Sequence, residues 1–418
     1  MLHSLEVRGF KSLRQVRVEL ARLVVVFGPN AAGKSNLLEA LVLLSRLVGE
    51  RTLADAFDEG IRGYPAEAFT LPGEGEAVGA DPSPTLRLGA RMGGDQPTLE
   101  YQVEVGMRLQ TGQLALVDER LQRLGRAGRP SGNAALERRD GVDGPRFAIR
   151  RKSKGSPPYE EKGEIRHTHV SNHQYSGKER FPDFDALRAE VGAWRVVYLD
   201  PREAMRRAQP PREVDDIGAR GEHLVPFLHR LAHDRSLSKY FDAIVRATRA
   251  VIPSVEEVRT DLAVARGEID LWVKQDGLWV SGRVISEGTL RVLALCAMAA
   301  NPLRRGLVAF EEPENGVHPR RIEVVTRLLA RAAQQRQVVV TTHSPLVVRE
   351  VVELIAKGEI GRDDVSLLRC RGGPDGTEVR RFEPKGALFV DSELQRALAA
   401  AEDADVVSAG LLRGWFDG

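Results

Sequence analysis

The chain has 418 residues, of which 42% are hydrophobic and 29% charged, and its formal net charge is +2. This is the composition of an ordinary soluble protein that can bury a large core in two or three domains, and the small net charge argues neither for nor against a nucleic-acid partner. No apolar segment approaches the roughly 20 residues that cross a bilayer, and two cysteines, Cys296 and Cys370, exclude a disulfide framework. Residues 1–10 read as an amphipathic strand rather than a signal peptide, so we expect a cytoplasmic protein.

The first fifty residues predict short strands followed by a buried helix. Alternating apolar residues indicate strands at 5–7 and 16–20, and a continuous β-branched run indicates a strand at 23–27. The segment 36–48 is apolar on nearly every side at helical spacing. A strand, a glycine-containing loop and a helix therefore follow one another directly.

The loop between that strand and that helix carries the full GxxxxGKS spacing of a P-loop. Its glycines let successive backbone N–H groups point at one anion, and the helix adds the positive end of its dipole. Lys34 is expected to reach the β- and γ-phosphates, and the Ser35 hydroxyl to bind Mg²⁺. The sequence thus predicts a nucleoside triphosphate site. The candidate nucleotide-binding residues are Gly28, Pro29, Asn30, Ala31, Ala32, Gly33, Lys34, Ser35 and Asn36.

The next region predicts an antiparallel β-layer and then a basic insertion. Segments 85–92, 99–107 and 113–117 read as strands with glycine-rich turns, whereas 121–182 is polar and without sustained periodicity. Residues 120–155 hold eleven basic and three acidic residues. This excess attracts phosphate backbones, so DNA or RNA is a candidate partner there; a solvated, partly disordered loop explains the same residues equally well. The basic residues are Arg120, Arg123, Arg126, Arg129, Arg138, Arg139, Arg146, Arg150, Arg151, Lys152 and Lys154.

Order returns with a buried strand at 194–199 and helical periodicity at 224–231 and 240–250. Further strands are expected at 255–264 and 269–273. Beyond them helices and strands alternate, which favours a parallel sheet with helices on its faces. The chain is therefore expected to be of the α/β class.

Paired carboxylates end the apolar strand expected at 306–312. Because side chains alternate along a strand, Glu311 and Glu312 project in opposite directions. We assign Glu311 to the metal side and Glu312 to the general base that activates water. An acidic strand end on an ordinary loop is the alternative interpretation of this motif alone.

Three further segments are weak singly and informative together. In 285–291, Ser286 is expected to cap a helix and Gly288 to expose N–H groups that suit a γ-phosphate, while Glu287 does not fit a capping box. Glu314, Asn315 and Gly316 begin a tight loop that ends at Pro319. The strand at 338–342 delivers His343 to the sheet edge where the P-loop lies, and we favour a γ-phosphate or water contact for it.

With these motifs, the chain resembles the ABC-type ATPase heads of the group that includes SMC proteins, RecF and the OLD-type nucleases, and especially their smaller AAA-family relatives. The matching stretches are LEVRGFKSL, GPNAAGKSNLLEAL, ISEGTLRVLAL, LVAFEEPENGVHP and VVVTTHSP. The resemblance implies that 28–35 is Walker A, 311–312 Walker B, 286–288 the signature loop, 314–316 the D-loop and His343 the switch histidine. The chain differs from the ATPases of transporters in its SEGT signature. Its Q-loop glutamine is not assigned, and Gln102 is a candidate by position alone.

The resemblance implies a P-loop NTPase fold with an antiparallel layer, a helical subdomain and the basic insertion. The expected domains are an N-terminal lobe (1–120), the insertion (121–182), a helical subdomain (183–253) and a C-terminal lobe (254–418). In such heads Ser286 and Gly288 of one subunit close on the nucleotide held by Lys34 of another. ATP and Mg²⁺ are therefore the expected cofactors, and a homodimer forms on ATP binding.

Three functions are compatible with these residues. The first is an ATP-hydrolysing switch in DNA repair, other DNA metabolism or phage defence. The second is an ATP-dependent scaffold that assembles or gates an effector protein, and the third is the ATPase subunit of a membrane transporter. A nuclease site is not expected, because no cluster of glutamates with a DxD pattern follows His343.

Overall fold

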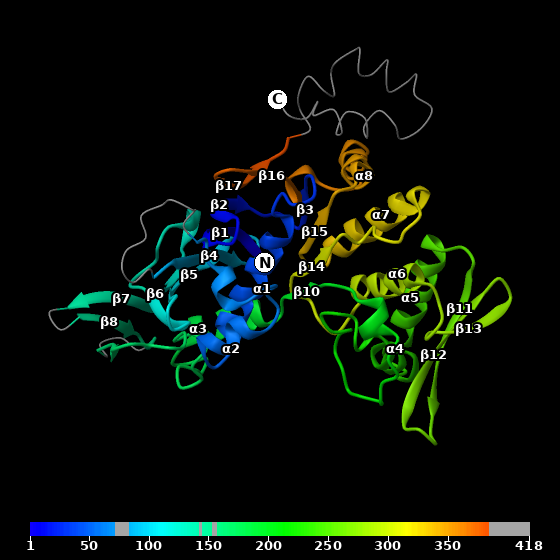
Figure 1. Ribbon diagram of the computed structural model, residues 1–418, viewed down its shortest axis with the longest axis horizontal. Coiled ribbons are helices and arrows are strands. Elements are labelled where there is room, and N and C mark those ends of the chain that lie inside the picture. Colours follow the sequence, from blue (N-terminus) through cyan, green and yellow to red (C-terminus); the bar gives the residue numbers. More distant parts are fainter. Residues whose placement is uncertain (72–82, 142–143, 153–156, 384–418) are drawn as a thin grey trace, which may run out of the picture. The chain divides into compact units, whose positions relative to one another are not determined.

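The computed structural model describes residues 1–71, 83–141, 144–152 and 157–383. The described residues form two compact units (Figure 1). Among the described residues, unit 1 contains Met1–Ala21, Gly28–Arg195 and Arg369–Arg380, and unit 2 contains Arg22–Phe27, Val196–Leu368 and 381–383. The domain boundaries expected from the sequence stay predictions.

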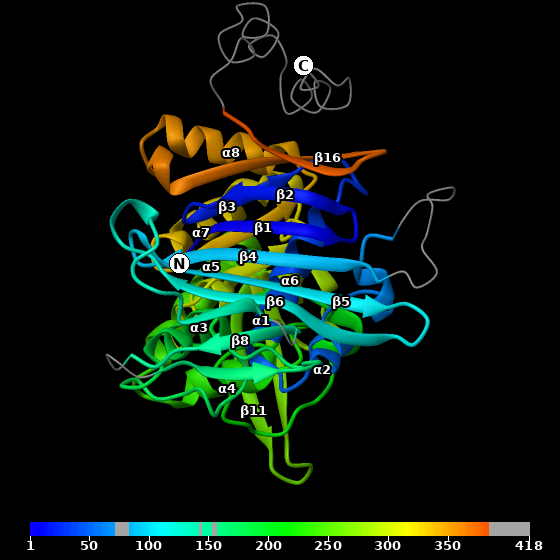
Figure 2. The ribbon, with the colours of Figure 1, turned by 90° about the vertical axis from the view of Figure 1, so that its left-hand side faces the viewer.

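Unit 1 is built on an eight-stranded sheet of order β2-β1-β4-β5-β6-β7-β8-β9, in which all described pairings are antiparallel (Figure 2). The N-terminal strands and the three central strands expected from the sequence are confirmed. The strands are β1 (Leu2–Phe10), β2 (Leu13–Glu19), β4 (Thr85–Gly93), β5 (Pro97–Arg108), β6 (Gln113–Arg123), β7 (Leu136–Gly141), β8 (Gly144–Ile149) and β9 (Tyr159–Lys162).

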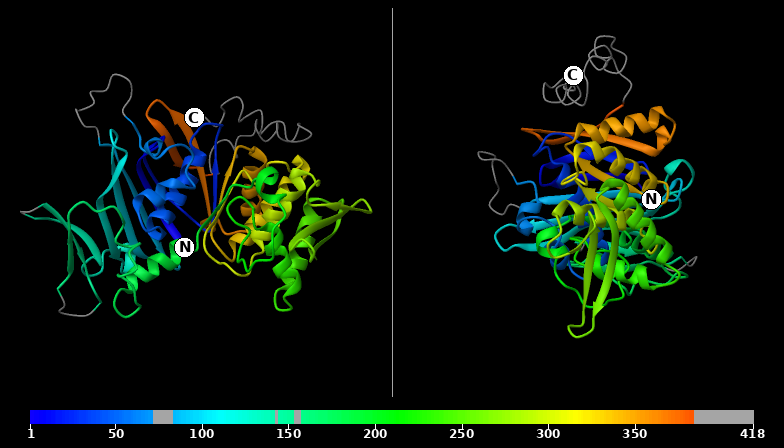
Figure 3. Two further views of the ribbon diagram at one scale, coloured as in Figure 1. Left: turned by 60° about the horizontal axis from the view of Figure 1, so that its bottom comes forward. Right: turned by 90° about the vertical axis from the view of Figure 1, so that its right-hand side faces the viewer.

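Three helices pack in unit 1 with this sheet (Figures 1 and 3). Helix α1 (Lys34–Gly49) buries ten of its sixteen residues, as its all-round apolar pattern predicts. Helix α2 (Leu53–Asp58) is capped by Thr52, and α3 (Pro182–Gly192) begins with a proline at its first turn.

The segment 121–182 is more ordered than its sequence indicates. Strands β7, β8 and β9 extend the sheet of unit 1, although their short length and the charged residues of β7 and β9 hide their alternation. A buried polar cluster joins the segment to β5 and β6. The Glu119 carboxylate accepts hydrogen bonds from the Tyr101 hydroxyl at 2.8 Å and from the backbone N–H of His169 at 2.7 Å, and it contacts Nδ1 of His169 at 2.7 Å.

The same cluster shifts the pKa of His169. Burial alone would lower this pKa, but hydrogen bonds and charges from Glu119 and Glu161 outweigh burial and raise it to about 9. The imidazole is therefore protonated at neutral pH and forms a buried ion pair in unit 1.

Unit 2 contains the parallel strands β3 (Leu23–Phe27), β14 (Val308–Glu311) and β15 (Val338–Thr342). The six-stranded sheet has the order β10-β14-β15-β3-β16-β17, with β10 spanning Arg195–Val197, β16 Val365–Gly373 and β17 Gly376–Arg381. Residues 23–27 and 338–342 are buried without alternation, as parallel strands covered on both faces require.

Apolar helices supply the rest of the core of unit 2. They are α4 (Leu224–His233), α5 (Ser238–Val251), α6 (Glu287–Ala299), α7 (Ile322–Ala333) and α8 (Pro345–Ala356). Helix α6 is buried over ten residues, including Cys296, whose thiol has a pKa raised to about 12 by burial. Both Cys296 and Cys370 are buried and unpaired with one another.

A separate three-stranded antiparallel sheet completes unit 2 (Figure 3). It consists of β11 (Val255–Ala263), β12 (Glu268–Gln275) and β13 (Leu278–Ser281), of which only the first two were predicted. Over the described residues, no helix combines the length and apolarity needed to span a membrane.

Candidate nucleotide and signature sites

The P-loop follows β3 without a break, because Phe27 ends the strand and Gly28 begins the loop. Three loop residues have positive φ: Gly28 (153°), Ala31 (63°) and Gly33 (89°). Glycine adopts such angles without steric cost, which explains two of the three positions. The chain thereby turns sharply before helix α1 begins at Lys34.

The start of α1 is prepared for an external anion. Its N-cap, Gly33, offers no side-chain acceptor, and the first turn contains no carboxylate. Nζ of Lys34, a residue that is only 5% exposed, donates to the carbonyl oxygens of Gly28 (3.0 Å) and Pro29 (2.9 Å). Backbone donors, a helix dipole and an ammonium group thus meet in one turn, which fits a polyphosphate.

Hydroxyl groups behind the loop hold it in shape. The Ser12 and Thr377 hydroxyls lie 2.7 Å apart, and the Asn36 amide donates to the Ser12 oxygen at 2.7 Å. A Cβ placed on Gly33 would lie 2.0 Å from the Thr377 hydroxyl, so only glycine fits there. Ser12 belongs to the LEVRGFKSL stretch, and this contact gives that stretch a structural purpose.

The paired carboxylates stand at the C-terminal edge of the parallel strands of unit 2. Glu311 pairs in register with Thr341 of β15, and Phe27 of β3 pairs with Thr342. The ends of β14, β15 and β3 therefore lie at one edge, and the P-loop starts there because it follows Phe27 in the chain.

Three predicted motifs meet on Glu312. Its carboxylate contacts Nδ1 of His343 at 3.2 Å and accepts a hydrogen bond from the Asn315 amide at 2.9 Å. The side chains of Glu312 and His343 are 24% and 45% exposed, so both reach solvent. Glu312 also has a φ of 44°, a left-handed conformation that costs a non-glycine residue about 1–3 kcal/mol. This strain occurs at the position assigned to the general base.

Glu314, two residues later, has the opposite environment. It is only 6% exposed, and the Thr342 hydroxyl donates a hydrogen bond to its carboxylate. Burial raises the pKa of Glu314. A carboxyl that is buried and held by a threonine is suited to fixing the loop, whereas Glu312 is suited to exchanging a proton with water.

The signature segment begins helix α6 as predicted. The Ser286 hydroxyl accepts from the backbone N–H of Thr289 at 3.1 Å and lies 2.8 Å from the Thr289 hydroxyl. Glu287 lies at the first helical position, too close to Ser286 for a capping box, and its carboxylate instead pairs with the exposed Arg202 guanidinium at 2.5 Å.

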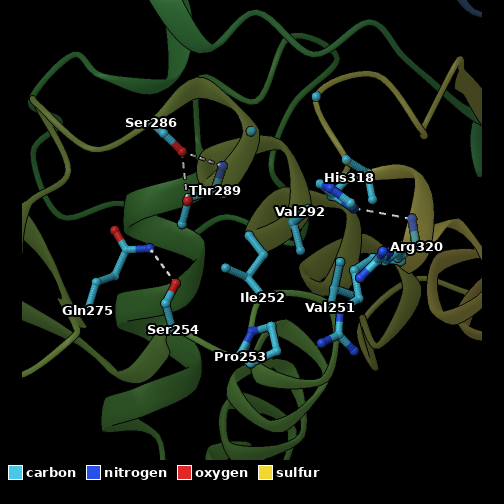
Figure 4. Close-up of a pocket in the computed structure, with 14 residues that line it drawn as sticks. Val251, Ile252, Pro253, Ser254, Gln275, Ser286, Thr289, Val292, His318 and Arg320 are labelled. Atoms are coloured by element: carbon cyan, nitrogen blue, oxygen red, sulfur yellow. Dashed lines mark hydrogen bonds between the residues drawn. The ribbon is translucent and has the colours of Figure 1, made fainter.

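The signature segment and the D-loop pack against each other within unit 2. A Cβ on Gly288 would lie 2.5 Å from the carbonyl oxygen of Gly316, so a side chain at this position would displace the D-loop. A cavity of about 720 Å³ opens beside them (Figure 4). Its polar lining residues include Ser286, Thr289, His318, Arg320 and Arg321, and Val251, Ile252, Pro253 and Val292 form its apolar part.

Some residues of the site were not singled out from the sequence, and one predicted residue lies in a strand rather than in a loop. The sequence analysis did not single out the arginines of this cavity or Thr377, although the Pro319-Arg320-Arg321 run beside the D-loop was a readable signal. Gln102 lies within strand β5, paired with Gly89 and Arg120, rather than in a loop. Lys154 and residues 384–418 of the expected C-terminal lobe lie outside the described residues.

Comparisons with known proteins identify the family and the fold of the chain. A family model described as "AAA domain, putative AbiEii toxin, Type IV TA system" matches residues 23–349. An Smc head bound to the C-winged helix domain of ScpA is 13% identical, with a TM-score of 0.53, covering 92% of this chain and 98% of that one.

Two further Smc heads are similar over comparable lengths. One is from Pyrococcus furiosus and was solved with an extended coiled coil, bound to the C-terminal domain of ScpA. It is 12% identical, with a TM-score of 0.49, and the match covers 94% of this chain and 99% of that one. One from Thermotoga maritima is 13% identical (91% and 99% covered, TM-score 0.42). The comparison with curated proteins gives no match. The chain belongs to the AAA-domain family named by the matching model, and its fold is the P-loop NTPase fold of the SMC-like, ABC-type ATPase heads.

Proposed function

We propose that this protein binds and hydrolyses ATP, and that two copies close around the nucleotide to form a switch. The observation that carries the proposal is the arrangement of Glu312, held by Asn315 and His343 at the strand edge from which the P-loop starts. A solvent-accessible carboxylate oriented by two neighbours is what a water-activating base needs.

The P-loop supplies the nucleotide site in this proposal. The backbone N–H groups of 28–35 and the ammonium group of Lys34 bind the phosphates. When the phosphates bind, the Lys34 ammonium group exchanges its hydrogen bonds to the Gly28 and Pro29 carbonyl oxygens for contacts with them. Ser35 and Glu311 would hold Mg²⁺, which neutralises charge on the phosphates when bound. Glu312 takes a proton from water as the water oxygen bonds to the γ-phosphorus and the bond to the bridging oxygen of ADP breaks. The proton then leaves Glu312 for the released phosphate or for solvent.

The signature face gives the reason for a dimer. The cavity in unit 2 is lined by Ser286, Gly288 and the neighbouring Arg320, and the helix start and the arginine suit an anion. We have assigned no anion of the same subunit to this cavity. We assign the γ-phosphate held by the second copy to this face. A twofold arrangement then completes two equal pockets.

A pair of isosteric variants tests the proposal. Glu312→Gln removes the base but keeps the shape, so turnover should fall by about 10²–10⁴-fold and an ATP-bound dimer should accumulate. Glu314→Gln is the matched control, because its carboxyl is buried against Thr342, and it should stay within about threefold of the wild type. Light scattering after gel filtration with ATP and Mg²⁺ measures the dimer. A Glu312→Gln protein that stays monomeric under these conditions rules out closure around the nucleotide.

We further propose that the switch acts in DNA metabolism or phage defence. The basic outer strands of unit 1 support a nucleic-acid partner, and the family description, which names a toxin–antitoxin system, supports a defence role. Turnover measured with and without DNA checks this: stimulation that disappears at higher salt is expected.

The second candidate is a scaffold that gates an effector protein. It is favoured by the structurally similar Smc head that was solved with the C-winged helix domain of ScpA bound. Turnover that ignores DNA but changes with a co-purifying protein would select this candidate.

A further inference from the structure

A second cavity, of about 640 Å³, lies among the outer strands of unit 1. Its walls come from the ends of β6, β7 and β8 and from the start of α3. A cavity of this size holds a small ligand or one unit of a polymer. Five of its lining residues are cations and one, Asp183, is a carboxylate; the cations are Arg123, Arg139, Arg150, Arg151 and Lys152.

Three of the arginines are held in place by carboxylates. Glu137 accepts from Arg139 at 2.9 Å and from Arg150 at 2.7 Å, so one carboxylate fixes two guanidinium groups. Asp183 pairs with Arg123. These partners orient the guanidinium groups without cancelling the excess of positive charge, which preorganises the wall for an anion.

The other two cations, Arg151 and Lys152, are exposed at the rim. The Arg151 guanidinium lies over the ring of Tyr159, 4.2 Å from its centroid. Tyr159 is 41% exposed, so a flat face of aromatic and guanidinium groups is accessible beside the cavity. Planar cations next to an exposed aromatic ring suit a ligand with both phosphates and bases.

We propose that this cavity and its rim bind a single-stranded nucleic acid, with phosphates on the arginines and Lys152 and a base stacked at Tyr159. The inference rests on the proposed function, since it names the nucleic-acid partner of the switch. A single strand can unstack a base onto the exposed aromatic face while its phosphates contact the cations, whereas a duplex keeps its bases stacked and presents only its backbone. An acidic protein segment would use the cations but has no need of the stacking face.

Fluorescence anisotropy with a labelled 20-nucleotide oligo-dT tests the inference on the full chain. Arg151→Ala combined with Lys152→Ala should weaken binding about tenfold and make its salt dependence shallower. The matched control combines Arg235→Ala with Lys239→Ala, two exposed cations of unit 2 with the same change in charge, and it should bind like the wild type. Tyr159→Leu should weaken binding about tenfold at every salt concentration, because stacking is not screened.

Four results would overturn the inference. The first is that the wild type does not bind oligo-dT, and the second is that the control pair loses as much affinity as the Arg151→Ala, Lys152→Ala protein. The third is that a duplex binds as tightly as the single strand. The fourth is that poly-glutamate displaces the labelled oligo-dT at a concentration at which unlabelled oligo-dT does not. Basal ATP turnover of the Arg151→Ala, Lys152→Ala protein should be unchanged. Failure here is thus distinguished from failure of the nucleotide switch, which the Glu312→Gln dimer measures separately.

Discussion

Each unit of the molecule contains a contact between a glutamate and a histidine, and the two contacts differ in every other respect. In unit 2, Glu312 and His343 are 3.2 Å apart at an open strand edge and reach solvent. In unit 1, Glu119 and His169 are 2.7 Å apart and have side chains that are 0% exposed. We therefore expect the same two residue types to serve chemistry in the pair that water reaches and stability in the pair that it does not reach.

The difference follows from the sheets. Parallel strands end together at one edge, so loops after β14 and β15 place reactive side chains beside each other and in contact with water. In the antiparallel sheet of unit 1 neighbouring strands run in opposite directions and do not end at a common edge, and its Glu119 cluster is buried between strand and loop. A catalytic role is thus expected of the exposed pair and a structural role of the buried pair.

The largest effect should come from breaking the buried pair. Glu119→Ala leaves a protonated His169 without its main partner, and we expect the free energy of unfolding to fall by about 3–5 kcal/mol. Glu312→Ala, at the exposed pair, should change it by less than about 1 kcal/mol. Urea unfolding of the two variants measures both values, and equal losses would remove the distinction between the pairs.

Lys34→Ala tests the nucleotide site. Loss of a charge-assisted contact to the phosphates should raise the dissociation constant for ATP about 10–100-fold. Lys357→Ala, an exposed lysine paired with Glu353 on α8, is the control and should bind ATP like the wild type. Calorimetric titration measures both proteins, and unchanged affinity in the Lys34 variant would contradict the assigned P-loop.

The dependence of stability on pH should report on the buried Glu119–His169 pair. The pKa of His169 is about 9 in the folded chain against an ordinary value of 6.5. Protonation therefore favours the folded state: the contribution is complete below about pH 6.5 and disappears as pH rises through about 9, a loss on the order of 3 kcal/mol. Thermal unfolding between pH 6 and 10 should show this decline in the wild type. The decline should be smaller in His169→Gln, and an identical decline in both would refute the assignment.

The smallest effect is expected behind the P-loop. Ser12→Ala leaves the Asn36 amide without its acceptor, and we expect about 1 kcal/mol of lost binding energy, or roughly fivefold weaker ATP binding. The measurement is the same calorimetric titration, with Ser4→Ala, a serine of β1, as the control. Unchanged affinity would show that the loop keeps its shape without Ser12.

The sequence singled out Glu312 and His343 in unit 2 because each follows a strongly apolar strand. Glu312, Asn315 and His343 were all singled out, and the structure brings them together. That result follows from parallel register, which joins strand ends that are far apart in the chain.

Other features were hidden for physical reasons. Strands β7 to β9 are short and rich in charge, so periodicity was too weak to separate them from a loop. The Glu119–His169 pair joins residues fifty positions apart, and no local pattern indicates that both are buried. Thr377 supports Gly33 from a strand more than 300 residues away, a contact that only the folded chain reveals.

The shared pocket can be tested most directly by mixing two inactive proteins. Ser286→Asp keeps a good N-cap on α6 but places a carboxylate where the partner's triphosphate would dock, and Ser286→Asn is its neutral control. Lys34→Ala damages the other half of the pocket. Neither variant alone should hydrolyse ATP well, but a mixed dimer has one complete pocket, so an equal mixture should recover up to about one quarter of the wild-type turnover. A mixture whose turnover equals only the average of the two separate variants would contradict a nucleotide pocket built from two subunits.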